Sequence, residues 1–237
     1  MAHVSELIKL ADFTSLPAGS THVIGVKTVL HLPKVILELR HKIGLLAAKR
    51  GSVEEFYIQE RGLYEPLEEV LIALLPKGAV VDHEPVLKKL ANSSQKSDLT
   101  IRRLECYPGE RLGAHEFAAI IEIKSVFFKE RLSESDILQD LEKLLECETA
   151  YSAKCYFVLV GLKDDLTRVG KSLSKLLLHN AIGPISLALP SGKTAWLHPS
   201  ARHVVDSPYL YVWTVSNVNN FGKHSSDYTY TVFHAAR

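Results

Sequence analysis

The chain has few cysteines, no long apolar run and no signal-peptide core. Its three cysteines, Cys106, Cys147 and Cys155, are odd in number and share no C-x-x-C spacing, which argues against a disulfide framework and against a cysteine zinc site. No segment has the uninterrupted apolar length that crossing a bilayer requires, and the first ten residues alternate polar and apolar side chains. We therefore expect a cytoplasmic protein without a membrane partner.

Charge of neither sign dominates. The 28 lysines and arginines nearly balance the 27 aspartates and glutamates, so the net charge is +1 with neutral histidines. A polyanion such as DNA would have to be held by a local basic patch. Solvated helix faces explain the basic residues equally well. The candidates for a patch are Arg102, Arg103, Lys129, Arg131, Lys163, Arg168, Lys171 and Lys175.

Two helices are predicted in the first third of the chain. Pro33 occupies a first-turn position, apolar residues recur at helical spacing as far as Leu46, and Gly51 ends the pattern. A second amphipathic pattern begins near Pro66 and stops at residues 76–78, which read Pro-Lys-Gly.

Strand patterns begin at Asp98. Residues 99–104 alternate polar and apolar side chains, residues 107–110 form a good turn, and residues 117–124 are an apolar run interrupted by two charges. Because a turn separates them, we expect the two strands to pair.

A helix and a further strand follow. Ser133 caps an amphipathic helix, residues 155–160 are apolar and β-prone, and Asp165 opens another helix. A strand, a helix and a strand in this order predict a right-handed parallel crossover. Short β-like segments then occupy residues 185–233.

The two charges in the strand 117–124 are Glu122 and Lys124. Side chains alternate along a strand, so both project from one face, roughly 7 Å apart, while Ile121 and Ile123 face the other way. One interpretation is an edge strand with solvated charges, because the E-x-K pattern is short and common. The other is a functional site, since a buried charge is costly unless it is paired or bound to a metal.

The chain has an aspartate before one strand, then a turn, an E-x-K strand, an amphipathic helix and another apolar strand. This order resembles the PD-(D/E)XK nuclease superfamily, the fold of many restriction enzymes and recombination nucleases. The resemblance covers about Leu63 to Leu177. It implies that Asp98 is the first metal-binding aspartate, Glu122 the second acid and Lys124 the catalytic lysine. Ser97 stands where many members of the family have proline.

The resemblance implies Mg²⁺ as the cofactor, with Mn²⁺ as a substitute. Asp98 and Glu122 offer hard oxygen ligands, and the Ile123 carbonyl would be the third. A divalent ion neutralises the pentavalent transition state and generates hydroxide near neutral pH. Lys124 would stabilise the developing charge or orient the attacking water.

Members of the family often carry a further acid on the first core helix. Glu68 fits best by helical phase. Glu60, Glu65 and Glu69 compete with it, and a solvated helix face explains all four equally well.

The implied fold class is α/β, a restriction endonuclease-like core with a central mixed β-sheet flanked by helices. We expect one domain over residues 1–237, with an N-terminal helical elaboration (1–62), a nuclease-like core (63–180) and a C-terminal β-rich extension (181–237). The implied function is a magnesium-dependent DNA endonuclease of restriction, defence or repair type, for which a homodimer would allow double-strand cutting. The alternatives are a non-catalytic DNA-binding or assembly module that retains the fold, and an unrelated α/β enzyme with a closed apolar pocket away from Asp98.

Overall fold

Seven strands form one sheet in the computed structural model, which describes residues 31–50, 60–75, 80–102, 117–127, 133–167, 184–204 and 208–218. The strands are β1 (Val81–His83), β2 (Leu99–Arg102), β3 (Phe117–Val126), β4 (Lys154–Gly161), β5 (Ile185–Ala188), β6 (Thr194–His203) and β7 (Tyr209–Ser216). The helices are α1 (Leu32–Arg50), α2 (Tyr64–Leu74), α3 (Glu134–Tyr151) and α4 (Lys163–Thr167), with a 3₁₀ turn, η1 (Glu60–Leu63), directly before α2.

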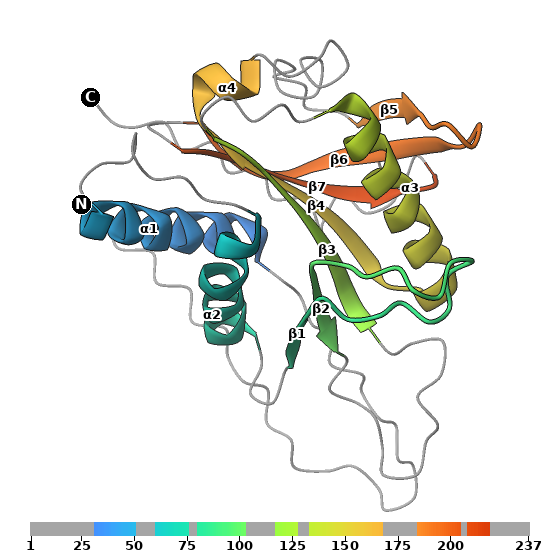
Figure 1. Cartoon of the computed structure of the whole chain (residues 1–237), viewed down its shortest axis with the longest axis horizontal. Coiled ribbons are helices and arrows are strands. Elements are labelled where there is room, and N and C mark those ends of the chain that lie inside the picture. The colour runs from blue at the N-terminus through green and yellow to red at the C-terminus, as the bar shows by residue number, and fades with distance from the viewer. Residues whose placement is uncertain are drawn as a thin grey trace, which may run out of the picture.

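The sheet is mixed. Its strand order is β1-β2-β3-β4-β7-β6-β5, and β3 and β4 are the parallel pair while the other neighbours are antiparallel. The expected pairing of β2 with β3 and the parallel connection from β3 through α3 to β4 are therefore confirmed. So is the α/β class, a mixed sheet flanked by helices (Figure 1).

The start of α3 follows from its sequence. Ser133 has extended backbone angles, and its Oγ accepts a hydrogen bond of 3.1 Å from the Asp136 backbone N–H. This bond satisfies one of the amide groups that a helix leaves unpaired in its first turn. The predicted cap is confirmed, and it fixes where the chain turns from β3 back across the sheet.

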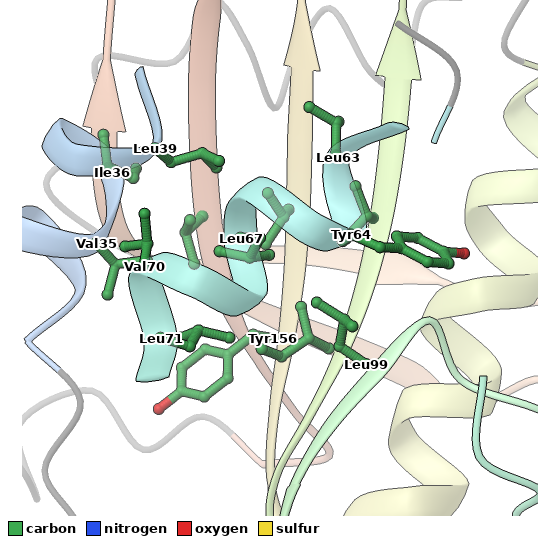
Figure 2. Packing of buried hydrophobic residues seen from close by; sticks show 14 of the residues in the cluster. Val35, Ile36, Leu39, Leu63, Tyr64, Leu67, Val70, Leu71, Leu99 and Tyr156 are labelled. Atoms are coloured by element: carbon green, nitrogen blue, oxygen red, sulfur yellow. The ribbon is translucent and has the colours of Figure 1, made fainter. Parts of the chain in front are cut away.

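Two apolar clusters lie on opposite faces of the sheet. On one face Ile121 and Ile123 of β3 pack with α1 and α2, a cluster that Figure 2 shows from close by. On the other face Ile120 of β3 and Phe157 of β4 pack with α3. The alternation expected for β3 is thus confirmed from Ala119 onwards, and the even-numbered side chains from Ile120 face α3.

The C-terminal strands complete the same sheet. β7 lies beside β4 and pairs with it from Cys155 opposite Val215 to Gly161 opposite Tyr209. The β-rich character predicted after residue 181 is present in the described residues 184–204 and 208–218, and these strands join the central sheet of the core. No helix in the described residues is long and apolar enough to span a membrane.

Several expected elements lie outside the described residues. They are the N-terminal residues 1–30, the turn at 107–110, the end of the first strand at 103–104 and the helix beyond Thr167.

Candidate functional site

β3 is an interior strand, so the edge-strand interpretation of its two charges is wrong. Glu122 is 1% exposed, and the Lys124 side chain is 14% exposed. Both lie on the face of the sheet that α3 covers, towards the carboxyl end of β3. Ligand sites in open α/β sheets commonly lie at this end of the strands.

Asp98 stands immediately before β2, next to this part of β3. Its Oδ1 accepts a hydrogen bond of 2.5 Å from the Tyr64 hydroxyl, and its Oδ2 accepts one of 2.6 Å from the Ile123 backbone N–H. Figure 2 shows the Tyr64 hydroxyl pointing away from the labelled apolar side chains. Because the N–H and C=O of one strand residue point to the same side, the Ile123 carbonyl also faces the side on which Asp98 lies. The aspartate is therefore held by two donors beside the E-x-K strand.

Glu122 is paired with a lysine from α3. Its Oε2 lies 2.6 Å from the Lys143 Nζ, while its buried Oε1 has no hydrogen-bond partner in the described part of the chain. Burial raises the pKa of Glu122 well above the ordinary value of 4.5; the Lys143 ammonium opposes this shift, and the charges of Asp98 and Asp140 add to it. Glu122 thus keeps an acceptor atom available at a buried position.

Lys124 forms two ion pairs. Its Nζ lies 2.9 Å from the Asp140 Oδ2 and 3.2 Å from the Glu60 Oε1. Burial acts to lower the pKa of Lys124, but attraction to Asp140 and Glu60 outweighs it, and the pKa is raised. Lys124 is therefore an ammonium in this structure, which suits charge stabilisation better than proton abstraction.

Helix α3 supplies two residues that the sequence interpretation did not include. Asp140 contacts Lys124, and Lys143, three residues later, contacts Glu122; the Lys143 Nζ and the Asp140 Oδ1 are 3.5 Å apart. Residues three apart on a helix are neighbours on its surface. Each charge of the E-x-K motif is thus paired with an oppositely charged residue of α3. The signal was available in the i, i+3 spacing, but a charged pair of this kind is also typical of a solvated helix face.

The structure places Glu60, and not Glu68, near the motif. Glu68 lies 2.8 Å from the His83 Nε2, Glu69 pairs with Lys42, and Glu65 is exposed. The choice of Glu68 assumed that the helical phase extends to the site. Glu60 instead lies in the η1 turn before α2, where the phase of the helix no longer applies.

Four carboxyl groups and two ammonium groups meet here. The acids are Glu60, Asp98, Glu122 and Asp140, and the bases are Lys124 and Lys143. Among the described residues no three His, Cys, Asp or Glu side chains form a ready metal-binding group. The donor chemistry nevertheless fits a hard cation. Acids outnumber bases, and the unpartnered Glu122 oxygen is the kind of ligand that Mg²⁺ prefers.

Two of the candidates for the basic patch, Arg102 and Lys163, belong to the described residues. Arg102 is engaged by Asp82 through hydrogen bonds of 2.6 and 2.7 Å, and Lys163, at the start of α4, is exposed. The remaining candidates for the patch lie outside the described residues. A hollow of about 260 Å³ between α3 and the C-terminal strands has a lining of Leu145, Thr149, Lys193, Thr194 and Asn217. Its lining is mixed polar and apolar, unlike the closed apolar pocket that a small-molecule enzyme would need.

Comparison of the chain with protein-family models, with curated proteins and with solved structures gave no match. The resemblance to the nuclease superfamily therefore rests on the residues and on the order of the elements.

Proposed function

We propose that this chain is a magnesium-dependent DNA endonuclease whose site consists of Asp98, Glu122 and Lys124. The observation that carries the proposal is the convergence of these residues at the carboxyl end of β3, with one oxygen of the buried Glu122 unpartnered. Two charges buried on an interior strand are unfavourable unless each is paired with an opposite charge or binds a ligand.

Each residue has a role that its contacts support. Asp98 and Glu122, with the Ile123 carbonyl, would hold Mg²⁺, and the bound ion supplies charge neutralisation and a more acidic water. Tyr64 and the Ile123 N–H fix the orientation of the Asp98 carboxylate. Lys124 carries the positive charge that stabilises the negative phosphorane as it forms.

The proposed substrate and assembly follow from this chemistry. A phosphodiester in DNA presents the negative charge that Lys124 would meet, and basic residues near the site would add salt-dependent contacts with the phosphates. One site per chain cuts one strand at a time, so double-strand cleavage would favour a homodimer. A cytoplasmic location is part of the same proposal.

A second candidate is a DNA-binding or assembly module that retains the fold without cutting. The observation that favours it is that both charges of the motif are already paired with α3, Lys124 with Asp140 and Glu122 with Lys143. Such a module would bind DNA but leave it intact whether or not Mg²⁺ is present.

The test is cleavage of plasmid and oligonucleotide DNA by the purified protein with Mg²⁺ or Mn²⁺. Lys124→Ala should abolish cutting while DNA binding, measured by gel shift in EDTA, is unchanged. Lys154→Ala is the matched control, because Lys154 is an exposed lysine at the start of β4. Cutting that survives Lys124→Ala would remove the assignment of the site. Binding without cutting by the wild type would favour the second candidate.

A further inference from the structure

Lys143 is a residue of the site to which the family resemblance assigns no role. Its Nζ lies 2.6 Å from the Glu122 Oε2 and 3.5 Å from the Asp140 Oδ1, and it donates a hydrogen bond of 3.0 Å to the Lys96 carbonyl. The side chain is 15% exposed. Among the described residues, Lys143 is the cation that lies at ion-pair distance from Glu122.

In this position the Lys143 ammonium would repel a divalent ion bound to Glu122. A carboxylate that already holds an ammonium has part of its charge neutralised, and a second cation on the same group meets repulsion at short range in a poorly hydrated site. Glu122 is almost fully buried, so water screens this repulsion weakly. Lys143 and a divalent ion therefore compete for the Glu122 carboxylate.

The Lys143 ammonium also has other acceptors within reach. An ammonium has three donors, and two further acceptors, the Asp140 Oδ1 and the Lys96 carbonyl, already lie beside it. Asp140 belongs to the same helix, so a change in the Lys143 side chain alone can move the ammonium from one carboxylate towards the other. The backbone of α3 need not shift.

We propose that Lys143 is a positioning residue that balances the Glu122 carboxylate when no divalent ion is bound and withdraws towards Asp140 and the Lys96 carbonyl when the ion binds. This rests on the proposed function, since it names the residue that regulates access of the metal to that site. It follows that Lys143 weakens metal binding and stabilises the metal-free protein.

The test is calorimetric titration of the whole chain with MnCl₂ in the absence of DNA, at about pH 8 because metal ligands bind in their deprotonated form. Lys143→Met removes the charge and keeps an apolar stem, and it should bind Mn²⁺ about tenfold or more tightly than the wild type, which corresponds to about 1.4 kcal/mol or more of relieved repulsion. Lys143→Arg keeps the charge and should not bind more tightly than the wild type. Lys154→Met, the same change at an exposed lysine, should match the wild type.

The outcomes separate this inference from the proposed function. Mn²⁺ binding by Lys143→Met that is equal to or weaker than that of the wild type would overturn the role of Lys143 and leave the metal site standing. Binding by neither protein would remove the metal site and the inference with it. Should Lys143→Met fail to fold, as judged by circular dichroism, Lys143→Gln provides the same comparison with a polar side chain of similar length.

Discussion

Replacing Tyr64 by phenylalanine tests whether Asp98 is anchored as the structure shows. The substitution removes the hydroxyl that donates to the Asp98 Oδ1 at 2.5 Å and leaves the ring in place. Tyr64 is 8% exposed and belongs to the apolar cluster under α1 and α2, so the aromatic packing is retained and no cavity is created. The Ile123 N–H remains as the second donor to Asp98.

The magnitude follows from the kind of bond that is lost. A hydrogen bond to a charged group contributes about 1.5–3 kcal/mol to stability. Asp98 is only partly buried, so water can replace part of the lost interaction and the lower end of that range applies. We expect the free energy of unfolding to fall by about 1.5 kcal/mol. For a chain of this size the melting temperature should fall by roughly 3–6 °C.

Urea unfolding monitored by circular dichroism measures this difference. Tyr211→Phe is the matched control, since Tyr211 is also 8% exposed but packs in the other cluster, under α3. A Tyr64→Phe protein as stable as the wild type, or no less stable than Tyr211→Phe, would refute the anchoring of Asp98. If the protein cuts DNA, the variant should also cut more slowly, because its aspartate is less well oriented.

Three further substitutions test other contacts. Because burial raises the pKa of Glu122 well above 4.5, this carboxyl keeps its proton to a higher pH in the folded protein than in the unfolded chain. Its contribution to stability is therefore lost as the pH rises from about 4.5 through the folded-state pKa. Glu122→Gln should therefore flatten the dependence of unfolding free energy on pH in urea titrations, and parallel curves would contradict the shift. Ser133→Ala should cost about 1 kcal/mol in the same assay, since the Asp136 N–H loses its cap. Gly161→Ala should cost about 1–3 kcal/mol, because its Cβ would lie 2.6 Å from the Val126 carbonyl oxygen; a Gly161→Ala protein as stable as the wild type would mean that β4 lies further from the end of β3.

Local chemistry made much of the central fold predictable. Ser133 marks the start of α3 through its own hydrogen-bonding capacity, and the period of two in β3 decides which side chains share a face. The parallel connection from β3 to β4 follows from an amphipathic helix between two apolar strands. Each of these features depends on residues close together in the chain.

The parts of the site that sequence reasoning missed depend on contacts between distant residues. Asp140 and Lys143 resemble any charged pair on a helix surface until the sheet beneath them places Glu122 and Lys124 opposite. Glu60 is among the acids that compete with Glu68 in the sequence, but it precedes α2, so no helical periodicity singles it out. The pairing of β7 with β4 could not be predicted either, because strand patterns give the identity of a strand but not its neighbour.

The position of β7 beside β4 has a consequence for synthesis of the chain. One edge of β4 pairs with β3, which precedes it in the chain, and the other edge pairs with β7, residues 209–216, which is synthesised later. A nascent chain therefore displays an open, strongly apolar strand edge for on the order of several seconds before its partner leaves the ribosome. A chaperone that covers β4 during this interval would protect it, and a product terminated before Tyr209 would carry the open edge permanently. Such a truncated product should aggregate through this open edge.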